Sequence, residues 1–183
     1  VDARSVANLL GLVESHYRAA MQRPAARAVI TIRIPSQKDD GWTTGGATVV
    51  QIITDDRPFL VDSVTMEVLR QGWSIREVFH PQFMVRRDLD GNLQGILRAS
   101  EAEHDPSAIP ESWMHLEILP PARPDRRDAL VPELELGLKE VLRLVEEAVE
   151  DWQKMITRSE DTIEMLKDPE FIKDARTQRA ELQ

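Results

Sequence analysis

The chain has 183 residues, and its 32 acidic and 23 basic side chains give it a formal net charge of −9 at pH 7. Such an acidic surface repels the phosphates of nucleic acids, which argues against a nucleic-acid partner. The sequence has no cysteine, which excludes disulfide frameworks, thiol catalysis and thiolate metal sites and fits a cytoplasmic protein. No apolar run approaches the roughly 18 residues that a membrane span needs, so we expect no membrane partner.

The first elements follow from the spacing of apolar residues. Residues 5–21 predict a short amphipathic helix, with Ser5 as its N-cap. Residues 27–35 alternate branched apolar and polar side chains, which is typical of a strand. A polar, glycine-rich loop over 36–46 then leads to residues 47–54, whose almost wholly apolar, β-branched composition predicts a buried central strand.

A second helix is predicted over about 58–71. Asp56 is placed to cap its start, and Pro58 suits its first turn because proline lacks the N–H that a first turn leaves unpaired. Gly72 suits its C-terminal cap, where a left-handed backbone is common.

Three further strand segments follow. Residues 74–87 predict a long strand bent near Pro81, because proline cannot donate a hydrogen bond to a neighbouring strand. Asp90 and Gly91 form a hairpin turn signal, and residues 94–98 predict the returning strand. Residues 112–119 alternate in a way that predicts another, half-buried strand.

The C-terminal part is predicted to be helical, from about 125 to 167 if it is unbroken. No single small sheet could cover so long a helix, so its distal part must pack on something outside this domain or break near Ser159. We interpret its apolar seam first as core and second as a subunit interface. The seam comprises Leu134, Leu138, Val141, Val145, Ala148, Trp152 and Met155.

The segment between the central strand and the second helix carries a resemblance. Asp56-Arg57-Pro58-Phe59-Leu60-Val61 resembles the Asp-x-Pro-Gly-x-Leu type of loop found in ACT domains. A wider stretch, about 47–156, is similar to the N-terminal region of the large NAD-specific glutamate dehydrogenases. The similar runs are TDDRPFLVDSVTMEVLRQGWSI (54–75), FHPQFMVRRDLDG (79–91), ESWMHLEI (111–118) and VEEAVEDWQKM (145–155).

This resemblance implies an α+β fold: a ferredoxin-like (ACT-like) antiparallel sheet with helices packed on one face, plus a long C-terminal helix. We expect an N-terminal helix over 1–24, an ACT-like domain over 25–156 and a helical linker or tail over 157–183. The usual last strand of that fold is missing after the second long helix. The strand at 28–35 is the candidate for the empty sheet edge.

The resemblance also implies a function. The full chain of that family deaminates L-glutamate to 2-oxoglutarate with NAD, using a catalytic domain far downstream. The first hypothesis for this region is therefore a non-catalytic module for assembly or regulation of a cytoplasmic glutamate dehydrogenase. Its expected partners are other domains of the same chain and further copies in a homo-oligomer.

The second hypothesis is an amino-acid sensor that binds a small-molecule effector at the 54–60 loop. The candidate loop residues are Asp55, Asp56, Arg57, Phe59 and Leu60. Backbone N–H groups at a helix start can hold a carboxylate. The simpler interpretation is that Asp55, Asp56 and Asp62 cap the helix and face its dipole. Phe59 stands where ligand-binding ACT loops often have glycine, so we expect its ring to turn inward and fill the ligand's place.

The sequence indicates no catalytic, cofactor-binding or metal-ligating residues in this chain. It lacks a glycine-rich phosphate cradle and a nucleophile–base set, so NAD is expected to bind the parent protein elsewhere. His80 and His115 are interpreted as ordinary sheet residues, since no histidine pair has the spacing of metal ligands. Arg86 and Arg87 are interpreted as a solvated strand end, with an acidic partner as the alternative.

Overall fold

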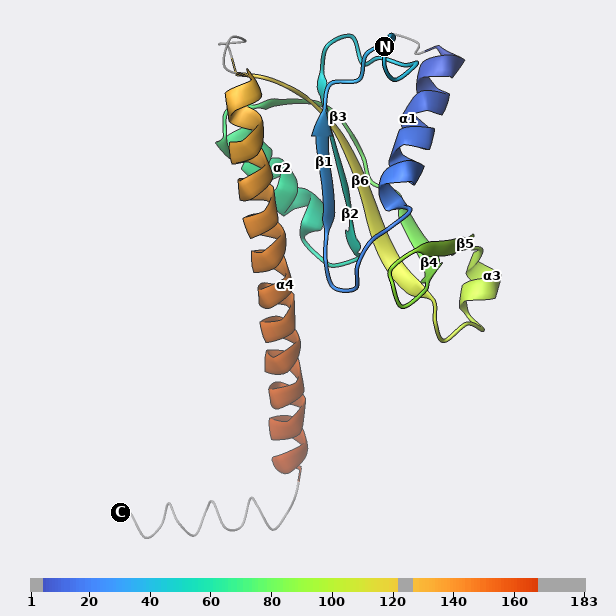
Figure 1. Ribbon diagram of the computed structural model, residues 1–183. Helices are drawn as coiled ribbons and strands as arrows, with labels where there is room; N and C mark the ends of the chain where they lie inside the picture. Colours follow the sequence, from blue (N-terminus) through green and yellow to red (C-terminus); the bar gives the residue numbers. More distant parts are fainter. Residues whose placement is uncertain (1–4, 122–126, 168–183) are drawn as a thin grey trace. The chain divides into compact units, whose positions relative to one another are not determined.

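A six-stranded antiparallel sheet is the centre of the first of two units into which the chain divides, residues 1–145 and 146–183. The computed structural model describes residues 5–121 and 127–167 (Figure 1). The strands are β1 (Val29–Arg33), β2 (Thr48–Asp55), β3 (Ser74–Phe79), β4 (Gln82–Arg87), β5 (Leu93–Leu97) and β6 (Ile109–Leu119). The helices are α1 (Val6–Ala20), α2 (Leu60–Arg70), α3 (Ala99–Ala102) and α4 (Arg127–Met165).

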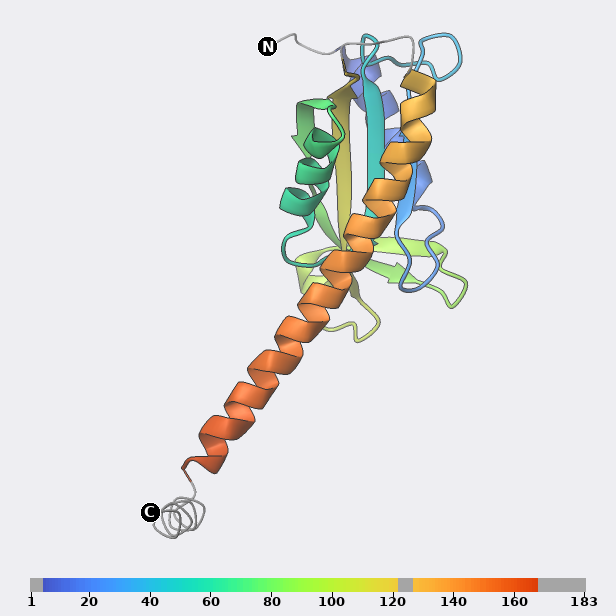
Figure 2. The same cartoon turned by 90° about the vertical axis from the view of Figure 1, so that its left-hand side faces the viewer.

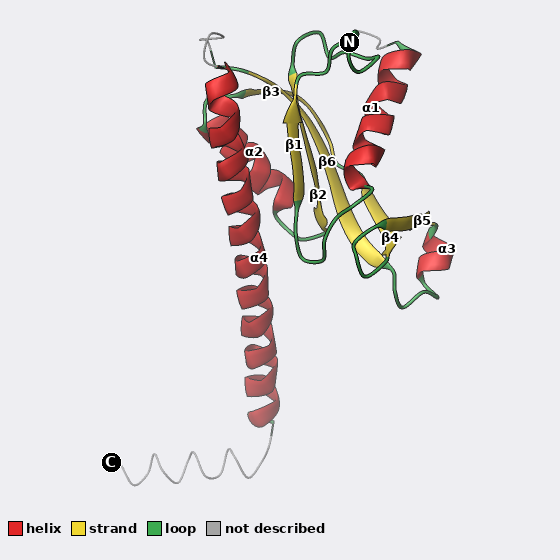
Figure 3. Cartoon of the chain, viewed as in Figure 1, coloured by secondary structure: helices red, strands yellow, loops and turns green. Residues whose placement is uncertain are grey.

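Strand β6 organises the sheet (Figure 3). β2 pairs with it along one edge, while β3 and β4 pair with successive stretches of its other edge. The predicted long strand over 74–87 is therefore two strands, divided at Pro81. β1 pairs antiparallel with the outer edge of β2. The ACT-like α+β fold is thus confirmed, and β1 lies at the sheet edge for which it was the predicted candidate.

Helices cover both faces of the sheet. Figures 1 and 2 show α1 on one face, and α2 with the part of α4 up to Val145 on the other. On the first face, the Ser15 hydroxyl of α1 donates to the Gln51 side chain of β2 at 3.3 Å. On the second, Gln71 at the end of α2 donates to the backbone oxygen of Glu133 in α4 at 3.3 Å.

The double cover corrects the prediction of a half-buried strand at 112–119. Every residue of β6 from Glu111 to Ile118 is buried, because side chains of both directions meet a helix layer. Trp113 and His115 face α1, where His16 lies against both rings, and Met114 and Leu116 point to the opposite face. The alternation of polar and apolar residues in β6 therefore distinguishes two buried faces of the sheet, and not a buried face from a solvent-exposed one.

Two of the predicted helix ends are confirmed. The Asn8 N–H donates to the Ser5 hydroxyl at 3.2 Å, so Ser5 caps α1 as expected. Gly72 follows α2 with φ +82°, and its N–H donates to the oxygen of Leu69 at 2.9 Å. The Trp73 N–H donates to Val68 at 3.2 Å, which completes a Schellman motif.

Helix α4 runs to Met165 without the break near Ser159 that was one of the two alternatives. Its buried positions are Leu134, Leu138, Leu142, Val145 and Val149. The predicted seam moves off this line, since Ala148, Trp152 and Met155 are exposed. Beyond Val149 every described residue of α4 is exposed, so no line of side chains on this part of the helix is buried. Among the described helices, none has the length and apolar character needed to cross a membrane.

Candidate functional site

The carboxylates of Asp55 and Asp56 bind side chains from other segments of the chain and do not cap a helix. The Asp55 carboxylate accepts a hydrogen bond from Arg23 at 2.6 Å. Both carboxylate oxygens of Asp56 lie 2.9 Å from the Gln82 amide nitrogen. The prediction that Asp56 caps α2 is therefore wrong: Phe59 is the N-cap residue, and no side chain caps the helix. Asp62 lies in the first turn, where the helix dipole favours a negative charge.

Phe59 also differs from its prediction. Its φ of +69° is in the left-handed region, and its side chain is 62% exposed instead of filling the loop. Leu60, 3% exposed, takes the buried position beside it, so the backbone turns the phenyl ring outward. Arg57 is half-buried. The loop therefore presents an aromatic ring at the surface beside a helix start without a side-chain cap.

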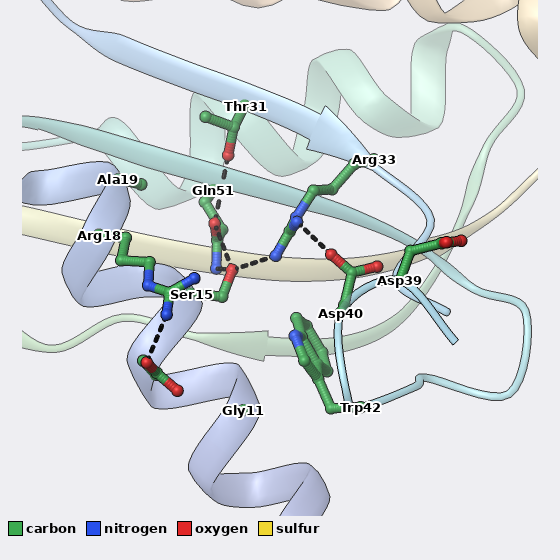
Figure 4. Close-up of a pocket in the computed structure, with 11 residues that line it drawn as sticks. Gly11, Ser15, Arg18, Ala19, Thr31, Arg33, Asp39, Asp40, Trp42 and Gln51 are labelled. Carbon is green, nitrogen blue, oxygen red and sulfur yellow. Dashed lines mark hydrogen bonds and ion pairs between the residues drawn. The ribbon is translucent and has the colours of Figure 1, made fainter. Parts of the chain in front are cut away.

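A polar pocket lies between α1, the edge strand β1, its neighbour β2 and the 36–42 loop (Figure 4). Its volume is about 380 Å³. The base of the pocket is Gln51, 1% exposed, whose side-chain oxygen accepts from Ser15 at 3.3 Å and from Thr31 at 3.2 Å. The Gln51 amide nitrogen donates back to Ser15 at 3.2 Å. A buried amide is thus held in one orientation by hydroxyls from a helix and a strand.

Charged side chains line the walls of this polar pocket. Arg33 donates to Ser15 at 2.7 Å and to Asp40 at 2.6 Å, and its guanidinium lies 5.7 Å from the centre of the Trp42 ring. On α1, Arg18 and Glu14 form an exposed ion pair at 2.6 Å. Figure 4 shows Arg18 and Arg33 on opposite sides of the space, with Asp39 and Asp40 at one end.

Gly11 allows Trp42 to form a wall of the polar pocket. A Cβ at position 11 would lie 2.5 Å from Trp42 Cγ, so only glycine lets the indole lie this close to α1. This pocket was not predicted, because the sequence indicated only an amphipathic helix at α1 and a polar loop at 36–46. Gln51, a polar residue inside an otherwise apolar strand, was the signal that could have indicated it.

An apolar groove lies on the same face of the sheet, between α1 and the β3, β4 and β6 strands, with a volume of about 680 Å³. None of its lining residues is aspartate, glutamate, lysine or arginine. Several apolar side chains at this groove are exposed, including Leu9, Val13 and Tyr17 on α1 and Val78 and Phe79 on β3. The groove is therefore an apolar surface that no described residue covers.

Histidines lie at the floor of the apolar groove. His115 is buried in β6, as expected of a sheet residue, and its ring centre lies 5.9 Å from that of His16. His80 has its Nε2 2.6 Å from the Ser112 hydroxyl. Burial, with a contribution from the charge of His115, lowers the pKa of His16 to about 4. His16 is therefore neutral at physiological pH, and the floor of the groove is uncharged at that position.

Below α1 the sheet carries a buried charge network of Arg23, Arg87, Glu111 and Asp55. Glu111 is fully buried and accepts from Arg23 at 2.7 Å and from Arg87 at 2.6 and 2.8 Å. Burial acts to raise the Glu111 pKa, but hydrogen bonds from Arg87 and Trp113 and the charge of Arg23 outweigh it and lower the pKa. Arg87 is thus no solvated strand end, and its acidic partner is Glu111. Arg86 is exposed and pairs with Asp105.

Comparison with known proteins identifies the domain. The sequence matches the family described as glutamate dehydrogenase, ACT1 domain, over residues 1–134. The chain belongs to this family. The resemblance found in the sequence is therefore confirmed, and the sheet with its α1 layer is an ACT1 domain.

Named relatives place the ACT1 domain within larger proteins. The NAD-specific glutamate dehydrogenase of Halomonas elongata is 30% identical over 163 residues, which is 89% of this chain and 10% of that protein. The protein of the same name from Pseudomonas aeruginosa is 31% identical, also over 89% of this chain and 10% of that protein. That of Mycobacterium tuberculosis is 28% identical over 80% of this chain. The chain thus spans about a tenth of the length of these relatives.

The ACT1 domain keeps its candidate residues in three separate places. The 54–60 loop lines neither the polar pocket nor the apolar groove, and these two have no lining residue in common. Within the described ranges, no group of three or more histidine, aspartate or glutamate side chains is positioned to hold a metal ion.

The low pKa of His16 predicts a pH dependence of stability. Because the folded-state pKa, about 4, lies below the ordinary 6.5, the unfolded chain binds the extra proton between these values. The contribution of His16 is thus intact above pH 6.5 and is lost as the pH falls towards 4, on the order of 3 kcal/mol.

Urea unfolding of the chain across this pH range measures the effect. His16→Gln is expected to flatten the pH dependence relative to the unaltered chain, whereas His104→Gln, at an exposed position, leaves it unchanged. An unaltered slope in His16→Gln contradicts the prediction. The titratable group of β6 that contacts His16 is His115, with 5.9 Å between ring centres, and the Nε2 of His115 lies 3.7 Å from the Oε1 of Glu117.

Proposed function

We propose that this ACT1 domain is a non-catalytic accessory module of a cytoplasmic, homo-oligomeric NAD-specific glutamate dehydrogenase. The parent enzyme would oxidatively deaminate L-glutamate to 2-oxoglutarate and reduce NAD. The names of the relatives support this activity, and the chain covers about a tenth of their length. The single observation that supports an assembly role is the uncovered apolar groove between α1 and the sheet.

The occupant that we propose for the groove is another segment of the same long polypeptide. About nine tenths of the length of the relatives lies outside the matched region, which provides many candidate segments. The groove has no charged lining residue, so its occupant must offer apolar side chains. Exposed apolar patches of this kind usually mark interfaces, because their burial removes apolar surface from water.

A comparison of the parent enzyme with the 183-residue chain tests the docking. Amide hydrogen exchange of α1 is expected to be at least about tenfold slower in the parent enzyme, where the groove is covered. Val13→Asp places a charge in the groove at a side chain that is 61% exposed, and should remove this protection. Leu89→Asp, at a fully exposed turn residue, is the matched control and should keep it. Equal exchange of α1 in the two proteins would contradict the docking role.

The proposal that the ACT1 domain is non-catalytic gives a prediction about activity. The parent enzyme, supplied with glutamate and NAD, is expected to produce NADH, and the 183-residue chain alone is expected to produce none above a buffer blank. NADP in place of NAD serves as the control for cofactor choice in the parent. NADH formation by the chain alone would refute a non-catalytic role.

The alternative function, effector binding at the 54–60 loop, is favoured by one observation. Phe59 leaves the loop instead of filling it, and the first turn of α2 has no side-chain cap. The N–H groups of that turn could therefore meet a ligand carboxylate. Chemical-shift changes confined to Leu60 and Val61 on titration with an amino acid would support this alternative.

A further inference from the structure

We infer that the distal part of α4 binds the same segment of a second copy of this chain, so that the two helices pack antiparallel. The segment covers residues 152–166 and lies within the second unit of the chain. It has no residue in common with the apolar groove. This contact is separate from the proposed docking at the groove, and it rests on the proposed function only in that the parent enzyme is a homo-oligomer.

An apolar stripe runs along this segment. Its members lie three or four positions apart, so they fall on one side of the helix. They are Trp152, Ile156, Ile163 and Leu166, with Ser159 at the centre. Each apolar side chain of the stripe is between 39 and 55% exposed. Leu166 follows the last residue of α4, and its N–H still donates to the oxygen of Thr162 at 3.0 Å, so it continues the helix. Exposed apolar stripes of this kind usually mark a contact with another protein surface.

The spacing of the stripe is that of a two-helix coiled coil. From Trp152 its members follow at steps of 4, 3, 4 and 3, which keeps them facing one partner helix. In an antiparallel pair, Trp152 lies opposite Ile163 of the second copy, and Ile156 lies opposite Ser159 of the second copy. Each of these layers of the contact therefore contains an isoleucine.

The sizes of the side chains favour the antiparallel order. The small Ser159 leaves room for Ile156, and its hydroxyl already donates to the oxygen of Met155 at 2.8 Å, so its burial leaves no polar atom unpaired. A parallel pair would instead place Trp152 against Trp152 and Ser159 against Ser159. One layer would then hold two indoles and another two hydroxyls, which packs less evenly. The stripe therefore fits its own copy best when the helices run in opposite directions.

The charges beside the stripe favour the same order. One flank carries, at every seventh position, Glu146, Gln153, Glu160 and Lys167. In the antiparallel pair Glu146 lies near Lys167 of the second copy, and Glu160 lies near the Gln153 amide of the second copy, so each carboxylate meets a donor. The positions on the other flank, Ala148, Met155 and Thr162, are uncharged. A parallel pair would place Glu160 beside Met155 and gain no such contact.

Lys167 can make this contact at small cost. It pairs with Glu164 at 2.8 Å, and both side chains are at least 65% exposed. Exposed ion pairs contribute little to stability, so Lys167 can exchange the carboxylate of its own helix for one from the second copy.

Sedimentation of the 183-residue chain over a range of concentrations tests the contact. A monomer–dimer equilibrium is expected, with more dimer as the concentration rises. Ile163→Glu places a charge in the apolar contact from each copy, and should weaken dimerisation at least about tenfold. Met165→Glu is the matched control, because Met165 has a similar exposure, 52% against 55%, but lies about 200° around the helix from Ile163. It should leave the dimer unchanged.

Disulfide trapping tests the order of the helices, and the absence of native cysteine leaves only the introduced thiols to react. Chains with Trp152→Cys are mixed with chains with Ile163→Cys and oxidised. Mass spectrometry is expected to find mainly the mixed dimer, because antiparallel helices bring position 152 of one copy opposite position 163 of the other. A parallel pair would join like chains instead. Both positions are exposed, so neither substitution should unfold the ACT1 domain.

A monomer at every concentration overturns the contact, and leaves the stripe to another segment of the parent polypeptide. Equal dimerisation of Ile163→Glu and Met165→Glu also overturns it, as does a majority of disulfides between like chains. Docking at the apolar groove is measured by hydrogen exchange of α1, and the groove contains none of these positions. The two proposals can therefore fail independently.

Discussion

Glu111→Gln is expected to lower the free energy of unfolding by about 3–5 kcal/mol, the usual cost of leaving one partner of a buried ion pair without its counter-charge. Arg23 and Arg87 are almost fully buried, with side chains 3% exposed, and both donate to this one carboxylate. A neutral amide keeps the shape but leaves Arg87 without its carboxylate, while Arg23 keeps Asp55, and the amide nitrogen cannot accept a hydrogen bond from either guanidinium. For a domain of this size the loss corresponds to a fall in Tm of roughly 6–20 °C.

Urea denaturation at pH 7 measures the loss, and Glu140→Gln is the matched control. Glu140 pairs with Arg143 in the open, where both side chains are at least half exposed, so its loss should cost less than about 1 kcal/mol. The folded-state pKa of Glu111 is lowered, so its contribution is present above the unfolded pKa of 4.5 and is lost as the pH falls through the folded value. The two proteins should therefore converge in stability in acid. A cost in Glu111→Gln no larger than in Glu140→Gln would contradict this account of the network.

Gly91→Ala is expected to destabilise the domain by about 3 kcal/mol or more, because two costs coincide at one position. Gly91 has φ +84°, which a residue with a Cβ adopts only with strain. The new Cβ would also lie 2.2 Å from the backbone oxygen of Arg23 and 3.0 Å from the Cα of Pro24. These are backbone atoms that cannot rotate away. Moving them displaces Arg23 from Glu111 as well.

Gly45→Ala separates these two costs. Gly45 has a similar φ of +67°, but a Cβ there would meet no atom within 4 Å. It should therefore cost only the backbone strain, roughly 1–2 kcal/mol. Chemical denaturation of both variants measures the difference. Equal losses in the two variants would mean that the close approach of residues 23 and 91 contributes nothing.

Features set by local sequence were predicted correctly. Ser5 and Gly72 act within a few residues of their own positions, so capping rules located the start of α1 and the end of α2. Apolar periodicity located the strands, and the absence of a last strand indicated that the segment at 28–35 fills the edge of the sheet. β1 does so, with Val29 opposite Ile53 and Arg33 opposite Val49.

Features set by distant residues were missed. Asp56 looked like a helix cap until β4 brought Gln82 within 2.9 Å of both its oxygens. Arg87 looked solvated because its partner, Glu111, lies on another strand. The hydrogen-bond partner of Gln51 is Ser15, which is 36 positions earlier in the chain. No local sequence pattern predicts these pairings, because they depend on the register between strands and on the packing of α1 against the sheet.

The position of β1 at the edge has a consequence for synthesis. In a chain made from its N-terminus, β1 and β2 are complete before β6, the central partner of β2, has been translated. β1 can therefore pair with one edge of β2 as a hairpin in the nascent chain, before residues 111–118 are available to pair with the other edge. An unpaired apolar strand promotes aggregation, and this order of synthesis shortens the time during which both edges of β2 are unpaired. If a strand after α4 paired with this edge, as in the usual arrangement, β2 would have no partner at this early stage of synthesis.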